Sequence, residues 1–511
     1  MAGIPGQSAT ETARALTPES PDPATLRRLL DRQLMSGAAW MGGTRLIAQL
    51  VTWVVSMAVA RILTPSDYGI VGMASVFLGM LVILGEFGIG SAVIAHPELP
   101  VDDVSELHTI ALGAGVASAI VAVAAALPLA RFFNTQELIW VVVTLSLNLV
   151  LNSLRTVPQA YLQRELRFRS VAKVDLVQST VQAAATLLFA LFGWRYWSLL
   201  LGTLLGSAVF SFSLWYASGL RLRLPSVRRH RAVLRVSRDV LATRLSWYGF
   251  QNADFAVIGR RIGDHALGVY TIAWNLALLP LEKLSSLTAN LSPAIFAAAR
   301  SDAALTRRYL LAMSNALLIV TLPPTVGIAL VAPDLVVTFV GSQWIEAIPS
   351  LRLLAMYCAV RCLDPLWTQL LIVSGDSRFA FRQNLLAFIV LPIAFYFASS
   401  RGIDYVAAAW IVVHPLVIVI PLFLRVSRRF GVSFRQQIVS ALPAIVSTAC
   451  MAAAVLLLQQ TITGNQPPLV RLLSASAVGA VTVAIVLFVG FRERVESLRR
   501  LIRHRSLEEI P

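Results

Sequence analysis

Charged side chains are scarce in this chain of 511 residues. Asp, Glu, Lys and Arg together make up 14% of it, whereas hydrophobic residues make up 57%. Ordinary soluble proteins carry roughly 25% charged residues, so this balance excludes a soluble globular protein. A membrane-spanning helix needs about 20 mostly apolar residues, so about fourteen of them would use about 280 residues and leave room for loops and tails.

Lysine is rarer still, and its scarcity excludes a nucleotide-driven motor in this sequence. The only lysines are Lys173 and Lys283, and neither follows a glycine, as the lysine of a phosphate-binding loop must. The His-Glu-x-x-His, Gly-x-Ser-x-Gly and Cys-x-x-Cys motifs of common enzymes and redox proteins are also missing. The sequence therefore predicts neither an ATPase nor an enzyme of these classes.

Cysteines are few and lie in apolar stretches. Cys358 and Cys362 are four residues apart with no histidine at ligand spacing, and Cys450 stands alone. We expect no disulfide framework, no metal site and no cofactor. The net charge of +16 includes no basic run interleaved with aromatic residues, so it indicates membrane topology rather than nucleic-acid binding.

Apolar runs long enough to cross a bilayer occur fourteen times, which predicts an all-α integral membrane protein. Interior prolines, such as Pro323 with Pro324 and Pro415 after His414, are expected to kink these helices. The predicted spans are 38–60, 70–94, 108–130, 137–154, 172–192, 197–218, 239–258, 266–298, 309–331, 347–373, 383–399, 405–424, 437–458 and 470–490.

Basic residues are distributed very unevenly between alternate connecting segments. If the N-terminus is cytoplasmic, 31 Arg and Lys residues lie in inner segments and seven in outer ones. Because cytoplasmic loops collect Arg and Lys, both termini are predicted to be cytoplasmic.

Two halves of the chain share a weak internal repeat. At an offset of 199 residues, Arg45 matches Arg244, Arg61 matches Arg260 and Gly69 matches Gly268. We therefore predict two parallel six-helix bundles plus an appended helix pair, an arrangement typical of transporters with a path between the halves. The predicted divisions are a disordered cytoplasmic tail (1–36), the N-terminal bundle (37–218), a basic cytoplasmic loop (219–238), the C-terminal bundle (239–425), helices 13 and 14 (426–491) and a basic cytoplasmic tail (492–511).

Polar residues follow one face of the first span and of its repeat, the seventh. Arg45, Gln49, Thr52 and Ser56 recur at helical spacing, and polar residues at membrane depth usually face a bundle interior or a wet cavity. Alternatively, each stripe packs against neighbouring helices, or the arginines extend to the headgroups. The candidate cavity residues are Arg45, Gln49, Thr52, Arg244, Tyr248, Gln251 and Asn252.

Four further ionisable residues within the spans are candidates for coupling to an ion. These are Asp254, Glu86, Arg361 and Asp364. The spacing of Arg361 and Asp364 slightly favours a structural pair on one helix. His414 precedes a proline within its span and is interpreted as a packing residue.

A cluster of carboxylates at 102–106 is the most enzyme-like feature, because such clusters can hold Mg²⁺ against a diphosphate. A membrane prenyl transferase would be expected to carry two such motifs, and this chain has one. A solvated loop is therefore favoured, and the protein is predicted not to be an enzyme.

Three segments are distinctive, and they read ARILTPSDYG at 60–69, PQAYLQRELRFR at 158–169, and Asn252-Ala253-Asp254 followed by IGR at 258–260 and LGVY at 267–270. With these segments the chain resembles the polysaccharide exporters, or O-antigen (Wzx-type) flippases, of the multidrug/oligosaccharidyl-lipid/polysaccharide superfamily. The resemblance covers roughly residues 35–460. It implies two bundles around a central cavity, working by alternating access in a bacterial plasma membrane.

The same resemblance implies a substrate, a polyprenyl-diphosphate-linked oligosaccharide moved from the inner to the outer leaflet for O-antigen, exopolysaccharide or capsule synthesis. A polymerase and glycosyltransferases of the pathway are the implied partners, besides membrane lipids. Arginine suits an anionic diphosphate because its guanidinium can make bidentate contacts. A lipid II flippase, a multidrug extruder of the same superfamily and a membrane glycosyl or prenyl transferase remain the alternatives.

Overall fold

A computed structural model describes residues 49, 51–86, 88–96, 98–224, 245–299, 302–462 and 466–492. Within these ranges every regular element is helical, as predicted, and ten helices are long and apolar enough to cross a membrane. Helix is also present in the described part of all fourteen predicted spans. The count of fourteen crossings remains a prediction, as do the divisions of the chain. The predicted terminal tails lie outside the described residues, apart from Arg492.

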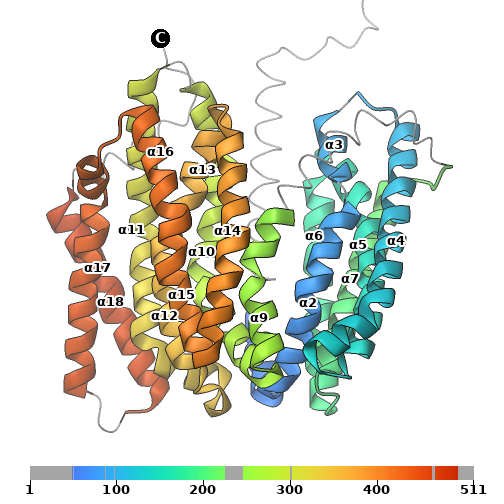
Figure 1. The fold of residues 1–511 in the computed structure, drawn as a ribbon, viewed down its shortest axis with the longest axis horizontal. Helices are drawn as coiled ribbons and strands as arrows, with labels where there is room; N and C mark the ends of the chain where they lie inside the picture. The colour runs from blue at the N-terminus through green and yellow to red at the C-terminus, as the bar shows by residue number, and fades with distance from the viewer. Residues whose placement is uncertain are drawn as a thin grey trace, which may run out of the picture.

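The N-terminal group of helices lies on the right of Figure 1. Its long helices α4 and α5, and then α6 and α7, pack as neighbouring pairs, while α5 also contacts α2 and α7. The elements are a helix over Val51–Ile62, α2 (Pro65–Glu86), α3 (Ile89–Ala95), α4 (Val101–Phe133), α5 (Leu138–Arg164), α6 (Phe168–Leu191) and α7 (Trp197–Ser218).

The second group begins in the middle of Figure 1 and continues to its left. It comprises a helical segment over 245–251, α9 (Ala253–Arg261), α10 (Asp264–Ala298), α11 (Ala303–Leu335), η1 (Val336–Val340), η2 (Ser342–Trp344), α12 (Ala347–Arg361), α13 (Asp364–Val373), α14 (Ser377–Ala398), η3 (Ser399–Arg401), α15 (Ile403–His414), η4 (Pro415–Val419) and α16 (Ile420–Phe430).

Prolines interrupt this group at only some of the expected places. The helix widens into a π-helical turn, η4, at Pro415, where a kink was expected. Pro323 and Pro324, by contrast, lie within α11, which continues without a break. The predicted tenth span is divided between α12 and α13 at Cys362 and Leu363.

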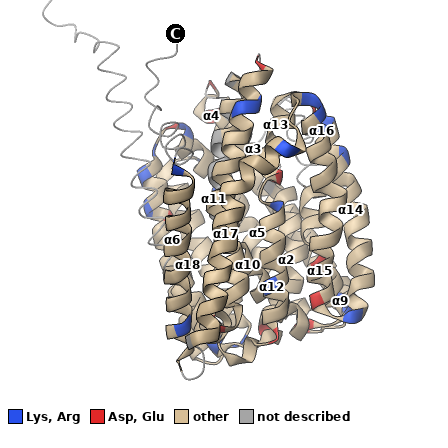
Figure 2. Ribbon diagram, turned by 90° about the vertical axis from the view of Figure 1, so that its left-hand side faces the viewer, with Lys and Arg blue, Asp and Glu red and all other residues tan. Residues whose placement is uncertain are grey.

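The last two helices, α17 (Phe434–Ile462) and α18 (Pro468–Gly490), pack against α11 on the outside of the second group. Arg471 of α18 forms an ion pair with Asp334 of α11, with 2.6 Å between Nη2 and Oδ1. Lys and Arg gather mainly near the two ends of the helices, leaving the middle largely uncharged (Figure 2). This distribution matches helices that cross a bilayer.

The two groups meet chiefly along α2 and α10. Both helices contribute to one large cluster of buried hydrophobic side chains, which includes Met73 and Ala74 of α2 and Val269 and Ala273 of α10. The contact lies toward the lower end of Figure 1, where α2 and α9 approach one another. The halves identified by the sequence repeat therefore share a core at one end.

Candidate binding cavity

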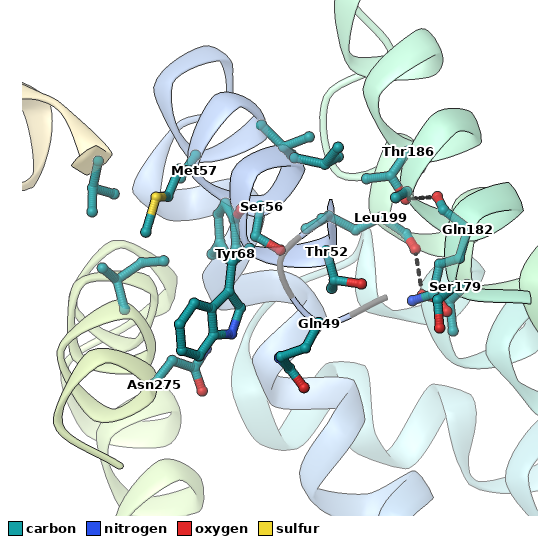
Figure 3. Close-up of a pocket in the computed structure, with 18 of the residues that line it drawn as sticks. Gln49, Thr52, Ser56, Met57, Tyr68, Ser179, Gln182, Thr186, Leu199 and Asn275 are labelled. Atoms are coloured by element: carbon teal, nitrogen blue, oxygen red, sulfur yellow. Dashed lines mark hydrogen bonds between the residues drawn. The ribbon is translucent and has the colours of Figure 1, made fainter. Parts of the chain in front are cut away.

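A cavity of about 580 Å³ lies where the two groups of helices face each other (Figure 3). Its walls come from the Val51–Ile62 helix, α6 and α7 of the first group and from α10 of the second. Sites that take small organic ligands usually have volumes of roughly 300–1,000 Å³. The space is therefore large enough for a ligand that both halves contact.

The first wall carries the polar stripe predicted from sequence. Gln49, Thr52 and Ser56 all line the cavity, and Trp53 lines it beside them. Helical spacing places these three polar residues on one face, and that face is turned toward α6 and α10. Arg45 lies outside the described residues, one helical turn before Gln49 in the sequence.

The second wall is a polar face of α6 that the sequence analysis did not identify. Asp175, Ser179, Gln182 and Thr186 line the cavity from this helix. Their spacing of four, three and four residues is the same as that of the stripe on the first span. The spacing could have revealed them, but three are uncharged residues that membrane helices commonly carry, and such residues are weaker signs of a cavity than ionisable ones.

Two glycines of α7 allow α6 to pack closely against this helix. A Cβ at Gly202 would overlap the side chain of Thr186, and one at Gly206 would overlap Cβ of Gln182. Glycines four residues apart allow membrane helices to approach closely. The pair Gly202 and Gly206 thus lets α7 lie closely against α6 at Thr186 and Gln182.

The described walls of the cavity carry little charge. Asp175 is the only charged residue among the described ones that line it. Asn275 of α10 adds an amide from the second group, and Tyr68 adds an aromatic ring at one end. The described walls therefore offer amide, hydroxyl and carboxylate groups interspersed with apolar side chains.

Next to Ala60, which lines the cavity, Gln343 and Trp344 contact the end of the first helix, and we call these contacts the seal. Nε2 of Gln343 donates to the carbonyls of Ala60 (2.7 Å) and Leu63 (2.8 Å). Nε1 of Trp344 also donates to the Ala60 carbonyl, at 2.8 Å. These bonds satisfy carbonyls that a helix leaves unpaired at its C-terminus, and they join the two groups of helices.

Polar residues of the seventh span are placed elsewhere. Tyr248 donates its hydroxyl to the Ser75 carbonyl of α2 at 3.0 Å, and Asn252 donates to the Tyr248 carbonyl at 2.9 Å. Gln251 accepts a hydrogen bond from Arg361 at 3.2 Å. None of the three residues of this stripe lines the cavity. Arg244 lies outside the described residues.

Asp254 is fully buried in the second group and accepts three hydrogen bonds. Tyr270 Oη donates at 2.7 Å, Trp410 Nε1 at 2.8 Å and the backbone N–H of Phe255 at 2.9 Å. Such a set of donors stabilises a carboxylate away from water. Asp254 thus lies apart from the cavity, buried within the second group beside the Tyr270 and Trp410 rings.

Arg361 ends α12 and Asp364 begins α13, with the turn at Cys362 and Leu363 between them, and the two opposite charges attract each other across this turn. Asp364 also approaches the buried His414, with 3.5 Å between Oδ2 and Nε2. His414 also packs edge-on against the Tyr357 ring. The side chain of Glu86 lies outside the described part of the structure.

The carboxylate cluster at 102–106 begins α4. Asp102 is exposed and pairs with Arg223, with 2.7 Å between Oδ2 and Nη1. Among the described residues no group of three or more His, Cys, Asp or Glu side chains is placed to hold a metal ion. The local contacts of Asp102 are those of a surface ion pair.

Solved structures with a similar fold are transporters. Lipid II flippase MurJ in an inward closed conformation matches with a TM-score of 0.72 at 14% identity, over 89% of this chain and 99% of that one. A multidrug resistance MATE family transporter of the MOP superfamily, in an inward-facing conformation, matches with a TM-score of 0.62 at 15% identity, over 74% and 94%. At such low identity these matches show the fold alone.

Curated relatives point to polysaccharide pathways. The chain is 24% identical over 418 residues to lipopolysaccharide biosynthesis protein WzxC of Escherichia coli (strain K12), covering 80% of this chain and 84% of that protein. It is 24% identical over 457 residues to succinoglycan biosynthesis transport protein ExoT of Rhizobium meliloti (strain 1021), covering 88% and 92%. The profile of the polysaccharide biosynthesis protein family matches residues 58–349, more than half of the chain. The resemblance seen in the sequence motifs is thereby confirmed, and the chain belongs to the polysaccharide biosynthesis protein family.

Proposed function

We propose that this protein is a flippase for a polyprenyl-diphosphate-linked oligosaccharide used in cell-surface polysaccharide synthesis. The observation that carries the proposal is the polar cavity between the two groups of apolar helices, lined by Gln49, Thr52 and Ser56 on one side and by α6 on the other. A polar headgroup cannot cross hydrocarbon unaided, and such a cavity gives it a path. The family and the names of the curated relatives support the substrate class.

The protein lies in the bacterial plasma membrane with both termini in the cytoplasm, as the distribution of arginines predicts. In this orientation the seal faces outward, and the substrate enters the cavity from the inner leaflet. Alternating access then requires the contacts of Gln343 and Trp344 with the first helix to break when the outer side opens. The polyprenyl tail stays in the lipid beside the helices.

Arg45 and Arg244 bind the diphosphate in this proposal. Arg45 precedes Gln49 by four residues in the sequence, so the proposed topology puts it on the cytoplasmic side of Gln49. A guanidinium can contact two phosphate oxygens at once, which suits a diphosphate entering from that side. Tyr248, Gln251 and Asn252 take part indirectly, through their contacts with α2 and Arg361.

An ion gradient supplies the energy, and Asp254, Asp364, Arg361 and Glu86 are the proposed coupling residues. The buried Asp254 and the Asp364–His414 pair are ionisable groups within the second group of helices, outside the cavity lining. A change in charge there would alter the packing of the helices that carry the seal. A polymerase and glycosyltransferases of the same pathway are the proposed partners.

The gene deletion tests this function. In the deletion strain, lipid-linked repeat units should accumulate on the inner leaflet, and surface polymer should fall to background. Restoring the gene should reverse both effects. Unchanged polymer export in the deletion strain would contradict the proposal. Arrest of peptidoglycan synthesis instead would favour the alternative of a lipid II flippase, whose fold is shared.

A further inference from the structure

We propose that the α6 wall of the cavity binds an uncharged sugar ring of the substrate and that Asp175 selects against an acidic sugar at this position. This inference rests on the proposed function, because it assigns one part of the transported molecule to one part of the cavity. The wall consists of Asp175, Ser179, Gln182 and Thr186. Figure 3 shows the last three of these residues across the cavity from Gln49 and Thr52.

The hydroxyl groups of α6 have their hydrogens occupied. Ser179 donates to the Asp175 carbonyl and Thr186 donates to the Gln182 carbonyl, both at 2.8 Å. A hydroxyl that donates to its own helix still has an oxygen that can accept. Ser179 therefore presents an acceptor to the cavity, whereas the Thr186 hydroxyl oxygen lies against Gly202 of α7.

Asp175 makes the same wall still richer in acceptors, because an ionised carboxylate can only accept hydrogen bonds. The amide oxygen of Gln182 is occupied, because it accepts from Gln178 at 3.4 Å, so the acceptors that this wall offers are those of Asp175 and Ser179. The natural partners of such a wall are groups that can donate, and the hydroxyls of a sugar ring can both donate and accept. A sugar ring thus matches this face.

An acidic group fits this wall poorly. The carboxylate of a uronic acid and the oxygens of a phosphate are acceptors only, and they would face Asp175 with the same charge. No cation lies among the described residues that line the cavity. The diphosphate therefore belongs nearer the cytoplasmic end, toward Arg45, and the neutral part of the headgroup lies against α6.

The position of the α6 wall is fixed by its packing. Gly202 and Gly206 leave room for the Thr186 and Gln182 side chains against α7, since a Cβ at either glycine would overlap them. Trp53 lines the cavity from the opposite helix and offers an apolar surface for the C–H face of a ring. A sugar ring can hydrogen-bond the polar groups on one side through its hydroxyls and pack its C–H face on the aromatic ring on the other side.

Protection of a single cysteine tests the inference on the full-length purified protein. Cys358, Cys362 and Cys450 are first replaced by alanine, and Ser179→Cys is then labelled with a water-soluble maleimide. Three synthetic probes are compared, namely farnesyl diphosphate, farnesyl diphosphate linked to a neutral disaccharide, and the same compound ending in glucuronic acid. Direct binding of each radiolabelled probe is measured separately.

The neutral disaccharide compound, at ten times its dissociation constant, should slow the labelling of Ser179→Cys about tenfold, because about nine-tenths of the protein is then occupied. Farnesyl diphosphate should bind and change the rate less than about twofold. The glucuronic compound should bind at least about fivefold more weakly than the neutral one, and Asp175→Asn should reduce this difference to less than about twofold. Thr180→Cys, on another face of α6, should be labelled at the same rate with each of the three probes.

Three results would overturn the inference. Equal protection by farnesyl diphosphate would place the diphosphate at α6, and no protection by a bound disaccharide compound would place the sugar elsewhere. A preference against glucuronic acid that persists in Asp175→Asn would remove the role of Asp175. In all three cases the probes still bind and the proposed function stands, whereas failure of every probe to bind would contradict the function itself.

Discussion

Gly69 and Gly268 lie in reciprocal contacts, each against the first residue of the other's helix. Gly69 of α2 touches the backbone carbonyl of Asp264, and Gly268 of α10 touches that of Pro65. Gly69 and Gly268 are 199 residues apart, and so are Pro65 and Asp264. The crossing of α2 and α10 is therefore approximately two-fold symmetric. The weak sequence repeat therefore marks the point where the two halves touch.

Alanine at either glycine should loosen this crossing. A Cβ at Gly69 or Gly268 would overlap a backbone carbonyl that cannot rotate away. We expect Gly69→Ala and Gly268→Ala each to cost about 1–3 kcal/mol in the free energy of unfolding, as overpacking does. Thermal unfolding in detergent measures this. Gly113→Ala, where nothing lies within 4 Å of the added Cβ, is the control, and equal stability of all three variants would refute the expectation.

The seal should open when its hydrogen bonds are removed. Gln343→Leu combined with Trp344→Phe keeps much of the side-chain volume and removes all three hydrogen bonds to the Ala60 and Leu63 carbonyls. Each lost bond costs roughly 0.5–1.5 kcal/mol, so the loss of all three should make the closed state at least about tenfold less favoured. Labelling of Ser56→Cys by an impermeant maleimide from outside the cell should accelerate accordingly.

A matched variant elsewhere separates this effect from general weakening. Gln459→Leu removes a similar bond, from a glutamine amide to the Leu330 carbonyl, between α17 and α11. It should leave the labelling of Ser56→Cys unchanged. If the seal variant labels no faster than the Gln459 variant, the contacts of Gln343 and Trp344 do not control access to the cavity.

Periodicity predicted which residues share a helix face, but it could not predict what each face contacts. The stripes on the first and seventh spans have the same character, yet Gln49 and Thr52 line the cavity whereas Tyr248 contacts α2. The difference arises from how the helices are rotated in the bundle, which depends on long-range packing. The polar face of α6 was missed although its spacing was readable, because hydroxyl residues in membrane helices usually bond to their own backbone, as Ser179 does.

Residues at a helix break were harder still to predict. Arg361 and Asp364 are three positions apart, which favours a pair only if one helix continues through them. The break after Arg361 places them on different helices, and Asp364 also lies 3.5 Å from His414 of α15, a residue interpreted from sequence as packing alone. The apolar runs themselves were predictable, since the length needed to cross a bilayer is set by its thickness.

Replacement of Tyr270 by phenylalanine should destabilise the protein, because Asp254 then loses one hydrogen-bond donor. The variant removes one of three hydrogen bonds to a fully buried carboxylate and leaves the ring in place. We expect a loss of about 1–3 kcal/mol in the free energy of unfolding, because hydrogen bonds to charged groups are the stronger ones. Thermal unfolding checks it. If adding Asp254→Asn to Tyr270→Phe restores the stability, the buried charge caused the loss. If it does not, a change in the packing of the ring caused it.

Loss of Arg45 or Arg244 should impair export while the amount of protein in the membrane stays the same. Arg45→Ala and Arg244→Ala should each lower polymer export at least about tenfold, the equivalent of roughly 1.4 kcal/mol of lost binding. Lysine at either position should restore only part of the activity, because an ammonium cannot make a bidentate contact. Surface polymer and membrane protein are quantified in the complemented deletion strain, and normal export by both alanine variants would remove these arginines from the site.

The appended helices should stabilise the seal through the ion pair of Arg471 and Asp334. Asp334 lies at the end of α11, directly before η1, whose Thr338 and Phe339 carbonyls accept from Arg61 of the first helix. The Asp334 side chain is 10% exposed and that of Arg471 33%, so the cost of removing one partner should lie between the roughly 1 kcal/mol of a surface pair and the roughly 3 kcal/mol of a buried one.

A charge exchange distinguishes this role from loss of packing. Arg471→Asp and Asp334→Arg should each accelerate the labelling of Ser56→Cys from outside, and the double variant should return most of the way to the original rate, since the pair is restored in reverse. Additive effects of the two changes would mean that the residues act separately. The appended pair α17 and α18 would then be attached to the second group without influencing how its outer end meets the first helix.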